Sequence, residues 1–120
     1  MPAEPVRRVP GGGAAPAPFR VELRRDGDTV LVRPVGELDV ATCASVRTEL
    51  ESAVESGCAR LILDLRGLTF MDSSGLHLMV TTQGTAVERG IRFSLIRGPA
   101  IVSRALELTG LQGRFEFVVP

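Results

Sequence analysis

The chain has 120 residues, of which 44% are hydrophobic and 23% are charged, as is typical of a single globular domain. Fourteen arginines balance fourteen acidic residues, and there is no Trp or Tyr. The zero formal charge argues against broad nucleic-acid binding, and no apolar run approaches the roughly 18 residues of a membrane span.

The first 18 residues are rich in Pro, Gly and Ala. Such a composition buries too little apolar surface to offset the conformational entropy that is lost on ordering. Arg7-Arg8 precedes Ala15-Pro16-Ala17, but the apolar core of an export signal is missing between them. We therefore predict a disordered tail over residues 1–18 and one folded domain over residues 19–120.

A strand hairpin is expected at the start of this domain. Apolar and polar residues alternate from Phe19 to Arg25, which predicts a half-buried strand. Asp26-Gly27-Asp28 predicts a turn into a second strand over Thr29–Val35. Pro34 indicates that this second strand is an edge strand or ends there.

A helix is expected next, with Asp39 as its N-cap, ending near Ser56 with Gly57 just beyond. Cys43 and Cys58 bracket this helix and would lie roughly 22 Å apart along its axis. A disulfide needs Cα atoms within about 7 Å of each other. Both cysteines are therefore expected to be free thiols, which is compatible with a reducing compartment.

The rest of the chain alternates strands and helices. Arg60–Leu65 is almost continuously apolar, which predicts a central parallel strand covered on both faces. A helix is expected to begin at Asp72-Ser73-Ser74-Gly75 and to end at Gly90. A strand over Ile91–Ile96, a helix from Gly98-Pro99 to Gly110, and a last strand over Phe115–Val119 complete the chain.

The order ββαβαβαβ predicts an α/β fold, with helices packed on a mixed, mostly parallel sheet of four to five strands. Carboxyl ends of parallel strands share one edge of the sheet, and sites form outside that edge. The loops that follow Val35, Leu65 and Ile96 should therefore meet. The residues expected there are Glu37, Asp39, Asp72, Ser73, Ser74, Arg97 and Gly98.

The Asp-Ser-Ser-Gly turn has two interpretations. Asp72 or Ser73 could simply cap a helix, with Gly75 permitting a tight turn. Alternatively, a phosphate on Ser73 would be tolerated at the helix N-terminus, where unpaired N–H groups carry partial positive charge. It would add about −1.5 to −2 charges near Asp39 and Asp72. A penalty of about 3 kcal/mol would weaken partner binding roughly a hundredfold.

Four segments stand in a characteristic order along the chain: Gly36-Glu37-Leu38-Asp39, the strand Leu61–Leu65, Phe70–Leu76, and Gly98-Pro99-Ala100 through Thr109-Gly110-Leu111. Together they resemble the STAS domain of bacterial anti-sigma factor antagonists, over roughly residues 19–119. The resemblance implies a STAS fold. It also implies that Ser73 is phosphorylated by an anti-sigma factor that is itself an ATP-dependent serine kinase.

In such proteins the unphosphorylated antagonist binds the kinase, so that the sigma factor is released, and a metal-dependent serine phosphatase restores the active form. The resemblance implies a cytoplasmic binding module that is not an enzyme and has no cofactor or metal of its own. The residues expected to contact the partner are Glu37, Asp39, Asp72, Ser73, Ser74, Gly75, His77 and Arg97.

His77 departs from the family pattern, because many members carry Gly or another residue there. It lies one helical turn beyond Ser73, so a protonated imidazole could partly neutralise a phosphate on that serine. The simpler interpretation is an exposed helix histidine.

Other functions remain as alternatives. Ser73, His77 and Asp72 are the residue types of a hydrolase triad, but Gly-x-Ser-x-Gly is absent and both Ser73 and His77 lie on one helix. No glycine-rich nucleotide motif and no usual zinc-ligand spacing is present. The closer alternative is a non-switching STAS subunit of a larger complex, such as a stress-sensing assembly or a lipid-transport system.

Overall fold

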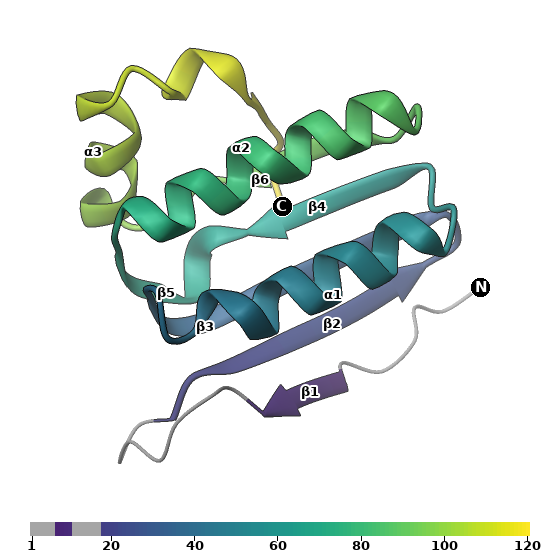
Figure 1. The fold of residues 1–120 in the computed structure, drawn as a ribbon, viewed down its shortest axis with the longest axis horizontal. Helices are drawn as coiled ribbons and strands as arrows, with labels where there is room; N and C mark the ends of the chain where they lie inside the picture. The colour runs from purple at the N-terminus through teal and green to yellow at the C-terminus, as the bar shows by residue number, and fades with distance from the viewer. Residues whose placement is uncertain (1–6, 11–17) are drawn as a thin grey trace.

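The computed structural model describes residues 7–10 and 18–120. Figure 1 shows α1 and α2 side by side on one face of a twisted sheet. The strands are β1 (Arg7–Pro10), β2 (Arg20–Asp26), β3 (Thr29–Leu38), β4 (Arg60–Asp64), β5 (Leu68–Met71), β6 (Arg92–Ile96) and β7 (Glu116–Phe117). The helices are α1 (Cys43–Glu55), α2 (Ser73–Glu88) and α3 (Ala100–Leu108), with 3-10 turns at Leu65–Gly67 and Gln112–Arg114.

The sheet is mixed and mostly parallel, as predicted. Its strand order is β1-β2-β3-β4-β6-β7, and β5 pairs with β3 beside this path. β1, β2 and β3 are antiparallel neighbours, whereas β3, β4, β6 and β7 run parallel. The five predicted strands are all present, and β1 and β5 are additional. The carboxyl ends of β3, β4 and β6 share one edge, which we call the carboxyl edge (Figure 1).

The core lies between the sheet and the two helices. Fully buried side chains of β2, β3 and β4, namely Val21, Val32, Leu61 and Leu63, pack with fully buried side chains of α1 and α2, namely Val46, Leu50 and Met79. α3 packs against β5 at the carboxyl edge. Leu111 donates its N–H to the Leu106 carbonyl at 3.1 Å, so the predicted C-cap of this helix is confirmed. None of the helices within residues 7–10 and 18–120 has the length and apolarity to cross a membrane.

β4 is central and parallel as predicted, but its expected covering on both faces is wrong. Ile62 faces away from the helices and is only partly buried. Asp64, which follows on the same face, is fully buried and lies beneath the side chains of Arg33 and Arg66. Long arginine side chains can cover apolar surface while their charged ends stay in water. An apolar run in the sequence therefore does not show whether the second face of a strand is covered by arginine side chains or by another layer of helices.

β3 is longer than predicted and passes straight through Pro34. This strand pairs with β4 over Thr29–Val32 and with β5 over Gly36–Leu38. Pro34 lies between the two pairings, so its missing N–H removes no hydrogen bond to either strand. The prediction of an edge strand or strand end at this residue is therefore wrong.

The predicted disordered tail does not hold at Arg7–Pro10, which forms β1 against β2. The open edge of β2 offers backbone donors and acceptors to any extended segment, so side-chain composition gave no sign of this pairing. Residues 1–6 and 11–17 lie outside the described residues. Cys43 and Cys58 are free thiols, and both are buried.

Candidate partner-binding site

Two loops meet at the carboxyl edge. Leu38 at the end of β3 pairs with Met71 at the end of β5, and the Asp72 N–H donates to the Leu38 carbonyl at 3.2 Å. Burial raises the pKa of the Cys43 thiol, and the carboxylates of Asp72 and Asp39 raise it further. Both carboxylates therefore lie near this thiol, and the loop after β3 adjoins the start of α2.

The Asp-Ser-Ser-Gly segment forms the start of α2, and Asp72 is its N-cap. The Asp72 carboxylate accepts a hydrogen bond from the Ser74 backbone N–H at 2.8 Å. Ser73 is the first helical residue and is exposed, and its hydroxyl makes no hydrogen bond with any described residue. Capping thus falls to Asp72, which leaves the Ser73 hydroxyl open to solvent.

Gly75 is required for packing rather than for a special backbone angle. A Cβ at this position would lie 2.6 Å from Met71 Cγ and 3.0 Å from Leu38 Cδ2. The residue itself is buried. The first turn of α2 can therefore approach β5 and β3 this closely only with glycine at this position.

Asp39 holds the loop before α1 but does not cap the helix, so that prediction is wrong. Its Oδ1 accepts hydrogen bonds from the N–H groups of Ala41 (2.9 Å) and Thr42 (3.1 Å). Thr42 occupies the N-cap position, and its hydroxyl donates to the Glu37 carbonyl at 2.7 Å. The Asp39 side chain thus forms a local turn, which competes with capping and delays the helix to Cys43.

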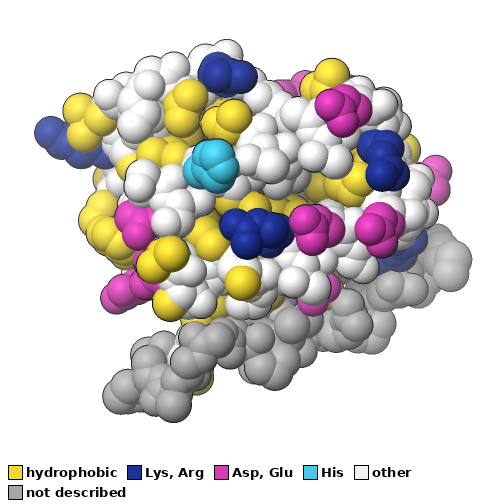
Figure 2. All heavy atoms as spheres, viewed as in Figure 1, with side chains coloured by type: hydrophobic (Ala, Val, Ile, Leu, Met, Phe, Trp, Pro, Cys, Tyr) yellow, Lys and Arg dark blue, Asp and Glu magenta, His cyan; other side chains and the backbone are white. Residues whose placement is uncertain are grey.

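Two further predicted residues are exposed near Ser73. Glu37 lies in β3 opposite Phe70 of β5. His77 lies on α2 one turn after Ser73, and Figure 2 shows the single histidine of the chain at the surface, with hydrophobic side chains around it. The Asp72 carboxylate engages the Ser74 N–H, so it does not orient an imidazole as a hydrolase triad requires.

Arg97 is placed differently. Its guanidinium carbon lies 4.2 Å from the ring centroid of Phe117 in β7, an arrangement that favours cation–π attraction. No contact within the described residues connects it with Ser73. Gly98, the next residue, follows β6 and packs against the turn after β4, where a Cβ would come within 2.6 Å of the Leu65 carbonyl oxygen.

Apolar residues at the same edge were not predicted as site residues. Val40, in the loop after β3, is 80% exposed, and Phe70, in β5, is 39% exposed. Exposed apolar side chains beside charged ones are common in protein–protein interfaces. We call the group Glu37, Asp39, Val40, Phe70, Asp72, Ser73 and His77 the Ser73 rim, in which Asp39 and Asp72 are half-buried and the others are exposed. Within the described residues no cluster of three His, Cys, Asp or Glu could hold a metal ion.

Comparisons with known proteins agree with this architecture. A family model described as STAS domain matches residues 20–118. An anti-sigma F factor antagonist of Paenibacillus polymyxa is 30% identical over 94 residues, which cover 78% of this chain and 80% of that protein.

Two solved structures share the fold. An anti-sigma factor antagonist from Mycobacterium paratuberculosis has a TM-score of 0.78 and 21% identity, covering 89% of this chain and 91% of that one. The anti-sigma factor antagonist SpoIIAA in its unphosphorylated form has a TM-score of 0.69 and 25% identity. The match covers 84% of this chain and 88% of that one.

Proposed function

Because this chain belongs to the STAS domain family, as its sequence predicted, we propose that it is an anti-sigma factor antagonist controlled by phosphorylation of Ser73. The unphosphorylated protein binds an anti-sigma factor in the cytoplasm. That factor, acting as an ATP-dependent serine kinase, phosphorylates Ser73 and so releases the antagonist, and a serine phosphatase reverses the modification. The observation that carries the proposal is the Ser73 hydroxyl, which is exposed at the start of α2, next to Asp72, and makes no hydrogen bond with any described residue.

The local electrostatics support a switch that leaves the fold intact. Ser73 begins a 16-residue helix, whose N-terminal dipole favours an added anion within the same chain. A partner surface experiences the opposite effect, because the Ser73 rim already carries Glu37 and Asp39. About −1.5 to −2 further charges would repel a partner that has no arginine to receive them. A penalty of about 3 kcal/mol is enough for roughly hundredfold weaker binding.

We assign partner contacts to the residues of the Ser73 rim. Ser74 and Gly75 position the Ser73 hydroxyl, since Ser74 receives the Asp72 cap and Gly75 sets how closely α2 approaches β5. Arg97 stays a predicted contact, with its side chain over Phe117 in the unbound protein.

Phosphopeptide mapping of the protein purified from its native cells tests the modification. Trypsin cleaves after Arg66 and Arg89, so Ser73 falls in a single peptide of residues 67–89. We expect the phosphate on Ser73, located by fragmentation, and its loss in a Ser73→Ala strain. A phosphate on Ser74 alone, or none under any growth condition, would contradict the proposal.

Binding measurements test the switch. The Ser73→Ala variant should retain the anti-sigma factor captured from native lysate, whereas Ser73→Asp should bind it about a hundredfold more weakly. Ser52→Asp is the matched control, because Ser52 is exposed on α1 and receives the same charge. Equal binding by both Ser73 variants would sink the mechanism. Capture of a membrane-transport or stress-sensing complex, without phosphate on Ser73, would favour a non-switching subunit.

A further inference from the structure

The sheet face opposite α1 and α2 carries a groove of about 240 Å³ that the proposed function does not use. It lies over β2, β3 and the ends of β4 and β6. Half-buried Leu31 contributes apolar surface above the buried Ile96, and Arg24, Arg33 and Arg66 contribute charge. Leu23 and Pro120 also line the groove. We call it the arginine groove.

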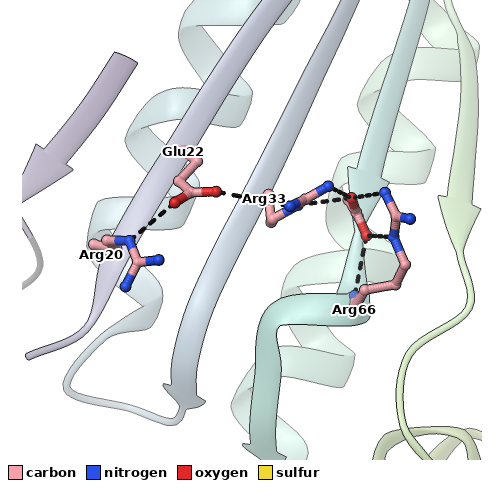
Figure 3. Close-up of polar contacts among 5 residues, drawn as sticks. Arg20, Glu22, Arg33 and Arg66 are labelled. Carbon is pink, nitrogen blue, oxygen red and sulfur yellow. Dashed lines mark hydrogen bonds and ion pairs between the residues drawn. The ribbon is translucent and has the colours of Figure 1, made fainter. Parts of the chain in front are cut away.

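The exposed charged side chains that line this groove are arginines, while its acidic side chains are largely covered. The Arg33 and Arg66 side chains are 35% and 43% exposed, whereas Asp64 is 0% exposed. Glu22, also in the groove wall, is 14% exposed and is engaged by Arg20 and Arg33 (Figure 3). Arg24 is exposed and has no ion pair with a described residue. On a chain of zero formal charge, this is a local cationic surface.

Asp64 holds two of the guanidinium groups in place from below. Its Oδ2 accepts hydrogen bonds from Arg33 Nε and Arg66 Nη2, both at 2.8 Å. Its Oδ1 accepts from Arg66 Nε and from the Arg66 backbone N–H, both at 3.0 Å. Figure 3 shows Arg33, from β3, and Arg66, from the turn after β4, pointing toward one carboxylate between them. Side chains that are already fixed lose less conformational entropy when they bind a ligand.

We propose that the arginine groove is a second protein-binding site, which takes an acidic peptide segment of a partner while the Ser73 rim stays free. Three guanidinium groups would receive carboxylates, and Leu31 would contact an apolar side chain between them. The site does not depend on the proposed switch.

Size and exposure favour a peptide over a small molecule. Pockets that enclose a drug-sized ligand measure about 300–1,000 Å³, so this open groove is too small to bury one. An exposed arginine–carboxylate pair strengthens binding by at most about fivefold, so several must form together. A peptide with several carboxylates can form several arginine–carboxylate pairs at once. None of the described residues that line the groove is aromatic, so bases would find no stacking partner there, which disfavours single-stranded nucleic acid.

NMR titration of the ¹⁵N-labelled chain with capped hexaglutamate tests the proposal. We expect saturable shifts at the amides of Arg24, Leu31, Arg33 and Arg66, and none at Ser73. Arg24→Glu should weaken binding about fivefold or more, because it removes one exposed contact and adds repulsion. It leaves the Asp64 ion pairs intact, so the fold is retained. Arg104→Glu makes the same charge change on exposed α3 and should alter affinity by less than about twofold.

Three results would overturn the proposal. The first is the absence of saturable binding. The second is a set of shifts spread over all exposed arginines, or an equal loss of affinity in both variants. The third is the same shifts and affinity with monomeric glutamate or inorganic phosphate, which would show a small-anion site in place of a peptide site.

Discussion

The Ser73 rim and the Asp64 network both depend on carboxylates, but they use them in opposite ways. Asp39 and Asp72 accept hydrogen bonds from backbone N–H groups of their own loops and remain partly exposed. Asp64 is fully buried and binds arginine side chains from its own strand end and from β3. Asp39 and Asp72 therefore shape the loops in which they lie, whereas Asp64 joins segments that are distant in sequence. Changes at the rim should therefore alter binding, and changes at Asp64 should alter stability.

The largest predicted difference is in the free energy of unfolding, between variants that truncate Asp64 and Asp72. Asp64→Ala should lower the free energy of unfolding by about 3 kcal/mol, the low end for a broken buried ion pair, because both arginines can still be solvated. Asp72→Ala removes only a helix cap and should lower it by about 1 kcal/mol. Urea denaturation of both variants measures the difference. Equal losses would show that the two regions do not differ in this way.

Gly75 tests how tightly the rim is packed onto the sheet. Gly75→Ala should destabilise the protein by about 2 kcal/mol, because the added methyl group overlaps Met71 and Leu38. Gly84→Ala is the matched control on the same helix, where nothing lies within 4 Å of the added atom. It should stabilise the protein by about 0.5–1 kcal/mol through helix propensity. Thermal unfolding of both variants measures these changes in stability. An unchanged stability of Gly75→Ala would contradict the close packing of α2 against β5 and β3.

Strong acid should weaken the Asp64 network, because Asp64 must be ionised to accept hydrogen bonds from both arginines. Burial alone would raise the pKa of Asp64, but hydrogen bonds from Arg66 and Arg33 outweigh it and lower this pKa. The contribution to stability is therefore complete above the unfolded value of about 3.9, and it is lost as the pH falls through the lower folded value.

Comparison of the wild type with Asp64→Asn isolates this contribution. Hydrogen bonds from Arg92 and Ser94 also lower the pKa of Glu116, to about 2, so this carboxylate adds a background that both proteins share. Denaturation midpoints between pH 5 and pH 2 should fall more steeply in the wild type. Parallel curves would exclude Asp64 as the source.

The smallest expected effect concerns His77. A phosphate on Ser73, one turn earlier on α2, stabilises the imidazolium form, so His77 should titrate at a higher pH in the phosphorylated protein. The chain contains a single histidine, so its ring signals are unambiguous by NMR. An identical titration in both forms would end this hypothesis.

Local patterns in the sequence were sufficient for the strand and helix alternation and for the position of Ser73 at a helix start. They were insufficient for β5, whose four residues form a strand only because the end of β3 supplies a partner. The orientation of Arg97 depends on Phe117, twenty residues later on the neighbouring strand. Val40 and Phe70 are exposed because no other helix or strand packs over them. A local sequence pattern does not predict this tertiary arrangement.

The pairing of β5 with the last residues of β3 has a mechanical consequence. The segment that carries Ser73 is anchored to a strand that also pairs with β2 and β4. A protein that docks on it meets a preformed surface and spends little free energy on ordering it. Association should therefore resemble the meeting of two rigid bodies, with a single kinetic phase and an on-rate that depends on ionic strength.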